Sequence, residues 1–162
     1  MLHNNFRDLS AKVGERLTKA GLMMVTAESC TGGWIGMEVT AIAGSSVWYD
    51  RGFITYSNEA KQDMLEVSAQ TLTKDGAVSE QTVLEMARGA IRHSRAQLAV
   101  SVSGIAGPGG GSVEKPVGTV WLAWVYGDKE IAKVFHFEGD RQAIRLEAVR
   151  ASLQGILNLL DA

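Results

Sequence analysis

The feature that most constrains this chain is the alternation of short apolar runs with amphipathic segments over its first two thirds. Runs at 22–27, 47–56 and 98–102 are rich in aliphatic, aromatic or β-branched residues, which predicts strands. Between them, apolar residues recur three and four positions apart, which predicts helices. Such alternation is typical of parallel strands with helices on both faces of the sheet. The helices are expected to begin near residues 6, 34, 58, 79 and 141, with Gly52 a bulge in the second strand.

The last third of the chain predicts a different connection. The segments 119–126 and 131–137 are strand-like, and Gly127-Asp128 between them indicates an antiparallel hairpin. Asp140 then caps the final predicted helix. We therefore expect an α/β fold whose mostly parallel sheet gains an antiparallel member, built as one domain over residues 1–162.

Composition excludes several classes of protein. The apolar fraction of 46% and the charged fraction of 21% are those of an ordered globular chain. No apolar run approaches the ~20 residues of a membrane span, and Met1 to Arg16 lacks a signal-peptide core, so no membrane partner is expected. The net charge of −2, without a cluster of lysine and arginine, argues against nucleic acid as a partner. The single cysteine predicts a reducing, cytoplasmic location.

Polar residues follow three of the predicted strands at the point where each ends. They are Glu28-Ser29, Tyr56-Ser57-Asn58 and Ser103-Gly104. In open sheets of this kind, sites form outside the carboxyl ends of the parallel strands. We expect these three segments, which are distant in the sequence, to converge at one edge of the sheet.

Ser29 is the candidate nucleophile. It lies between a strand and a helix, where N–H groups of the next residues can stabilise an oxyanion. Those residues are Cys30, Thr31, Gly32 and Gly33. The alternative interpretation is that Ser29 is only the N-cap of the following helix. Cys30 competes for the nucleophilic role, but adjacent residues point in opposite directions and no histidine base is evident for it, so Ser29 is favoured.

Lys61 is the candidate base, because none of the three histidines (His3, His93 and His136) falls at a predicted strand end. A lysine acts as a base when burial lowers its pKa. Tyr56, five residues earlier, is suited to relay the proton or to orient the lysine and the serine. The alternative interpretation is a solvated helix lysine and a half-buried strand tyrosine. No ligand spacing for a metal is present, so neither a metal nor a cofactor is expected.

The glycine-rich loop 104–118 lacks the Gly-Lys-Ser/Thr ending of a nucleotide-binding P-loop. Its N–H groups, including that of Gly107, either form an anion-binding nest or belong to a flexible surface loop. Arg141 and Arg145, near the start of the last helix, either pair with a phosphate or are solvated.

Five motifs in order resemble the C-terminal domain of the competence/damage-inducible protein CinA, over about residues 6–160. They are Ala27-Glu28-Ser29-Cys30-Thr31-Gly32-Gly33, Gly52-Phe53-Ile54-Thr55-Tyr56-Ser57-Asn58-Glu59-Ala60-Lys61, Gly76-Ala77-Val78-Ser79, Ser103-Gly104-Ile105-Ala106-Gly107-Pro108 and Lys115-Pro116-Val117-Gly118-Thr119-Val120. The resemblance implies a three-layer α/β/α fold and hydrolysis of nicotinamide mononucleotide to nicotinate mononucleotide and ammonia, a step that recycles pyridine nucleotides. It implies no pyrophosphatase activity, which belongs to a further domain of the longer members.

The resemblance also assigns roles to residues. It implies a Ser-Tyr-Lys arrangement of Ser29, Tyr56 and Lys61, and a phosphate site formed by the loop from Ser103 together with Arg145. A small-molecule nucleotide is then the expected partner, Asn58 is a candidate to bind the base, and a homodimer is expected. Two alternatives stay open: a nucleotide-binding regulatory module without turnover, and an amidase for another phosphorylated amide.

Overall fold

The computed structural model describes residues 2–162, with side chains from Phe6 onward, and its centre is a five-stranded sheet of order β2-β1-β3-β4-β5. The strands are β1 (Met24–Glu28), β2 (Tyr49–Ile54), β3 (Leu98–Gly104), β4 (Thr119–Tyr126) and β5 (Lys129–His136). β1 pairs in parallel with β2 and β3, whereas β4 is antiparallel to both β3 and β5. Four strands thus share one direction, which confirms the predicted mixed, mostly parallel sheet.

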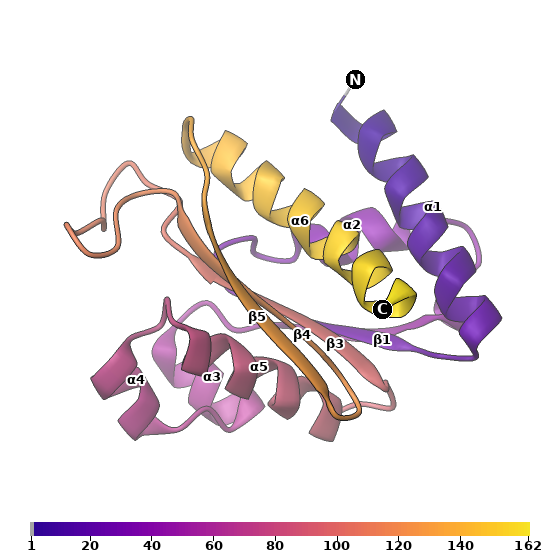
Figure 1. Ribbon diagram of the computed structural model, residues 1–162, viewed down its shortest axis with the longest axis horizontal. Helices are drawn as coiled ribbons and strands as arrows, with labels where there is room; N and C mark the ends of the chain where they lie inside the picture. The colour runs from indigo at the N-terminus through magenta and orange to yellow at the C-terminus, as the bar shows by residue number, and fades with distance from the viewer. Residues whose placement is uncertain (1) are drawn as a thin grey trace.

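Helices cover both faces of the sheet, which gives the three-layer α/β/α fold (Figure 1). One face carries α1 (Leu2–Ala20), α2 (Trp34–Thr40) and α6 (Arg141–Asp161), and the other carries α3 (Asn58–Leu65), α4 (Ala69–Asp75) and α5 (Glu80–Arg92). A separate apolar core fills each interface. α1 and α6 pack on each other over the first face, and α5 lies against β3 and β4 on the second.

The helices that flank the predicted site begin at side-chain caps. Ser57 accepts a hydrogen bond from the N–H of Ala60 at 3.0 Å, so Ser57 and not Asn58 caps α3. Asp140 caps α6 in the same way, through the N–H of Ala143 at 2.9 Å. Each cap satisfies an N–H group that the helix itself leaves without an acceptor, and so fixes where the helix starts.

Several predicted boundaries were wrong. α4 was not predicted at all, and the predicted strand 47–56 is shortened to β2, preceded by a 3-10 turn, Ser45–Val47. The predicted bulge at Gly52 was also wrong, because Gly52 pairs regularly with Thr26 and the register shift falls earlier, around Asp50. A side chain at position 52 would instead collide with the hydroxyl groups of Thr26 and Tyr49.

Gly89 sets how closely α5 approaches the end of the helix that carries Lys61. A Cβ at this position would collide with the main-chain carbonyl of Leu65, the last residue of α3. We expect Gly89→Ala to lower the free energy of unfolding by about 1–3 kcal/mol, the usual cost of overpacking, as measured by urea denaturation. Gly109→Ala is the control, since a Cβ there meets nothing within 4 Å. Equal stability of the two variants would contradict this role of Gly89.

Candidate active site

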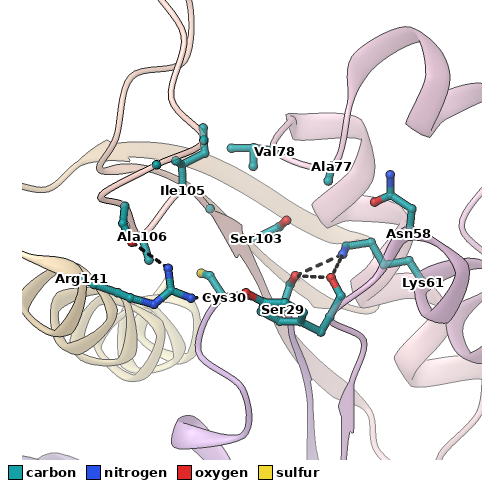
Figure 2. A pocket seen from close by; sticks show the side chains of 15 residues that line it. Ser29, Cys30, Asn58, Lys61, Ala77, Val78, Ser103, Ile105, Ala106 and Arg141 are labelled. Carbon is teal, nitrogen blue, oxygen red and sulfur yellow. Dashed lines mark hydrogen bonds between the residues drawn. The ribbon is translucent and has the colours of Figure 1, made fainter.

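The three predicted segments meet at the carboxyl ends of β1, β2 and β3, as expected. They surround a cleft of about 310 Å³, which the side chains in Figure 2 line. Its lining residues are Ser29, Cys30, Tyr56, Asn58, Lys61, Ala77, Val78, Ser103, Gly104, Ile105, Ala106, Gly107, Gly109, Gly110 and Arg141. Most of the predicted site residues are therefore brought together, although Thr31, Gly32, Gly33 and Arg145 are not among the lining.

Ser29 and Lys61 are in direct contact in this cleft (Figure 2). Ser29 directly follows β1, and its N–H donates to the carbonyl of Val102 on β3 at 3.0 Å, which continues the sheet pattern. Lys61 lies on α3, and its Nζ is 3.1 Å from the Oγ of Ser29. The two side chains thus have the spacing that transfer of a proton from hydroxyl to amine requires.

The Lys61 amine is enclosed by the protein. The residue is 1% exposed, and Nζ also donates to the main-chain carbonyls of Thr55 at 3.0 Å and Tyr56 at 3.1 Å. Within residues 2–162, no carboxylate forms an ion pair with it. Burial lowers the pKa of Lys61 from the ordinary lysine value, and this favours the neutral amine that a base needs.

Tyr56 contacts the Ser29–Lys61 pair through its main chain. Its main-chain carbonyl lies 3.1 Å from the Lys61 Nζ and 3.4 Å from the Ser29 Oγ, so it orients both groups. The residue is 63% exposed, and the phenol oxygen accepts a hydrogen bond from Nη2 of Arg141 at 3.3 Å. The carbonyl, rather than the phenol, is therefore the part of Tyr56 that touches the Ser29–Lys61 pair.

The turn after Ser29 is closed by its own hydrogen bonds. The N–H of Gly32 donates to the carbonyl of Ser29 at 3.1 Å, so this N–H is not free for an oxyanion, contrary to expectation. Gly32 and Gly33 have φ values of 58° and 102°, which favour glycine. The buried Glu28 carboxylate accepts from the hydroxyl of Thr31 at 2.6 Å and from the N–H of Ile35 at 2.9 Å.

Cys30 is the other group with nucleophilic chemistry in the cleft. It is 7% exposed, and burial raises the pKa of its thiol to about 11. A thiol with this pKa is almost entirely protonated at neutral pH, and the thiolate is the reactive form. This environment supports the choice of Ser29 over Cys30.

The two arginines of α6 have separate surroundings. Arg141 lines the cleft, and its Nη1 donates to the carbonyl of Gly107 at 2.7 Å, which ties the glycine-rich loop to the helix (Figure 2). Arg145 lies on a neighbouring hollow with Thr31, Gly32 and Gly33. Its Nε donates to the carbonyl of Cys30 at 2.9 Å.

Sequence reasoning gave no role to one wall of the cleft, formed by Ala77 and Val78. The motif Gly76-Ala77-Val78-Ser79 was the available signal. His93 contacts Glu66 and, like His136, does not line the cleft, whereas the side chain of His3 lies outside the described residues. Among the side chains of residues 6–162, no group of three His, Cys, Asp or Glu is placed to hold a metal ion, and no helix within residues 2–162 is long and apolar enough to cross a membrane.

Known proteins share this sequence and this fold. The nicotinamide-nucleotide amidohydrolase PncC of Escherichia coli strain K12 is 53% identical over 155 residues, which cover 95% of this chain and 94% of that protein. The PncC of Pseudomonas putida is 47% identical over 93% of this chain and 94% of its own. The crystal structure of the competence/damage inducible protein CihA from Agrobacterium tumefaciens superposes with a TM-score of 0.93 at 50% identity, covering 97% of this chain and 96% of that one.

The family model for the CinA C-terminal domain matches residues 6–160, which include every residue of the cleft. The family that the five sequence motifs resemble is therefore the family that the whole chain matches. The chain belongs to the CinA C-terminal domain family.

Proposed function

We propose that this protein is an amidohydrolase that converts nicotinamide mononucleotide to nicotinate mononucleotide and ammonia. The observation that carries the proposal is the 3.1 Å contact between the buried amine of Lys61 and the hydroxyl of Ser29. A serine beside a desolvated lysine is an activated nucleophile for acyl transfer. The relatives named as nicotinamide-nucleotide amidohydrolases support the substrate, since they match this chain over nearly all of their length.

In the proposed reaction, these two residues carry the proton transfers and the covalent step. Neutral Lys61 takes the hydroxyl proton as the Oγ of Ser29 bonds to the carboxamide carbon. Lys61 then returns that proton to the nitrogen as the carbon–nitrogen bond breaks, which releases ammonia and leaves an ester on Ser29. Water, deprotonated by the same amine, attacks this ester; Lys61 then returns the proton to the Oγ of Ser29 as the ester bond breaks, and the carboxylate product leaves.

Other cleft groups have roles in binding and in stabilising charge. The main-chain N–H of Cys30 belongs to the peptide that follows Ser29, which is the usual place for an oxyanion donor, worth about 3 kcal/mol of barrier. Arg141 also lines the cleft, and its positive charge is available to bind the nucleotide phosphate. Asn58 and Ser103 offer side-chain hydrogen bonds to the carboxamide that the pyridine ring carries. Tyr56 acts through its carbonyl, which holds the amine of Lys61 toward Ser29.

Ammonia release from three amides tests the proposal. Nicotinamide mononucleotide, nicotinamide riboside and nicotinamide are compared with and without a chelator. We expect the mononucleotide to react with the highest kcat/KM, at least about tenfold above the riboside if one charged contact holds its phosphate. The chelator is expected to change nothing. Thermal stabilisation by the mononucleotide without ammonia would indicate a binding module, and faster release from another phosphorylated amide would change the substrate.

A further inference from the structure

Arg145 lies behind the turn that presents Ser29 and not in the cleft itself. Its Nε donates to the carbonyl of Cys30 at 2.9 Å, and its Nη2 donates to the carbonyl of Thr31 at 3.2 Å. The guanidinium also lies over the ring of Trp34, 5.4 Å from its centroid, which restrains it further. Two of its donors are thus committed to main-chain atoms one and two residues after the nucleophile.

Two peptide units, joined by one hydrogen bond, connect this arginine to the reacting centre. The carbonyl and the N–H of a trans peptide point in opposite directions, so a carbonyl that is held in place also fixes the N–H of the next residue. The carbonyl of Thr31 is held by Arg145, and the N–H of Gly32 in the same peptide donates to the carbonyl of Ser29. That carbonyl in turn shares its peptide with the N–H of Cys30, the proposed oxyanion donor.

We propose that Arg145 is a positioning residue, which aims the N–H of Cys30 at the oxyanion through this chain of peptides. The inference rests on the proposed function and replaces the phosphate-binding role that the family resemblance suggested for Arg145. The positive charge also polarises the Thr31–Gly32 peptide, which makes the N–H of Gly32 a better donor to the carbonyl of Ser29. The carboxylate of Glu28 also holds this turn in place, because it accepts hydrogen bonds from the hydroxyl of Thr31 and the N–H of Ile35.

The sequence offers a matched control on the same helix. Arg150 lies one and a half turns further along α6. Its guanidinium lies 5.7 Å from the centroid of the Phe6 ring and donates to Glu147. Removing either arginine therefore removes a half-buried cation from an aromatic ring of the same core, but only Arg145 touches the Ser29 turn.

The experiment compares Arg145→Met, Arg145→Lys and Arg150→Met with the unmodified protein. We expect Arg145→Met to lower kcat about 10- to 100-fold while KM for nicotinamide mononucleotide stays within about threefold, because a misdirected oxyanion donor affects the transition state and not ground-state binding. Arg145→Lys, whose ammonium reaches one carbonyl, is expected to retain an intermediate kcat. Arg150→Met is expected to stay within about twofold in both constants. Melting temperatures of all variants check that each remains folded.

Three outcomes overturn the inference. One is a KM for the mononucleotide that rises more than tenfold in Arg145→Met while kcat is retained, which identifies a phosphate ligand instead. The second is an equal loss of kcat in Arg150→Met, which identifies a general packing effect. The third is a kcat unchanged in Arg145→Met.

A second readout keeps the inference testable if the mononucleotide is not the substrate. A fluorophosphonate reacts with an activated serine: the hydroxyl proton passes to Lys61, an oxygen–phosphorus bond forms and fluoride leaves, and intact mass reports the rate. The incoming phosphoryl oxygen needs the same N–H donor, so we expect labelling of Ser29 to slow by a similar factor in Arg145→Met and not in Arg150→Met. Rapid labelling of the unmodified protein without ammonia release would contradict the proposed substrate alone. Equal labelling of both variants would contradict the role of Arg145.

Discussion

Replacing Ser29 with alanine is expected to abolish ammonia release, with kcat lowered by at least about 10³-fold, because no covalent route remains. Ser29 is 7% exposed and its Oγ lies 3.1 Å from the amine of Lys61, so loss of one oxygen leaves a void smaller than a water site and the fold intact. Ammonia is measured in a coupled assay, and the melting temperature of the variant is compared with that of the unmodified protein.

The neighbouring thiol provides the control for this variant. With a pKa of about 11, Cys30 is not expected to replace the missing hydroxyl. The double variant Ser29→Ala/Cys30→Ala should therefore be no less active than Ser29→Ala alone. Residual turnover that disappears only in the double variant would assign the attack to the thiol. Residual turnover in both would indicate direct attack by water.

Replacing Lys61 with methionine is expected to lower kcat/KM by about 10²- to 10⁴-fold, the usual contribution of a positioned general base. Methionine has a similar length and suits a site that is 1% exposed, so the variant should fold. Lys61→Arg keeps a cation that does not release its proton and is expected to be equally inactive. An active Lys61→Arg variant would show that the charge, and not the basicity, of Lys61 matters.

The pH dependence of the unmodified protein should report the same residue. Only the unprotonated amine accepts the serine proton, and its fraction grows as pH rises. Because burial lowers the pKa of Lys61, we expect kcat/KM to rise with pH and then to reach a plateau. The midpoint of this rise should lie below the ordinary lysine pKa of ~10.4. This inflection should be absent from the residual activity of Lys61→Met. A rate that falls as pH rises through this range would contradict the assignment.

The elements that carry the site were predictable because their sequence signals are strong. The runs that became β1 and β3 are apolar except for Thr26 and Ser101, and the helix caps Ser57 and Asp140 have the expected residue types. The short α4 has one buried residue, Leu72, and two threonines, so neither periodicity nor propensity indicates it. The shift beside Asp50 depends on the pairing of two strands, which the sequence of one strand does not encode.

The candidate site was predictable in its side chains but not in its main-chain contacts. Ser29 and Lys61 follow strand ends, and the rule that such ends converge brought them together. The carbonyl of Tyr56 and the two carbonyls that Arg145 contacts are main-chain groups. Every residue has such a group, so no sequence motif indicates these contacts. For this reason the sequence did not indicate that Tyr56 acts through its carbonyl or that Arg145 contacts the main chain.

The acceptors that surround the Lys61 amine bear on how this family can vary. Apart from Ser29, they are consecutive carbonyls of the backbone, on Thr55, Tyr56 and Ser57. Substitutions there leave the acceptors in place as long as the chain keeps its path. A one-residue insertion or deletion between position 55 and Lys61 would move every acceptor at once. The basicity of this lysine is therefore protected against drift in residue identity and vulnerable to changes in segment length.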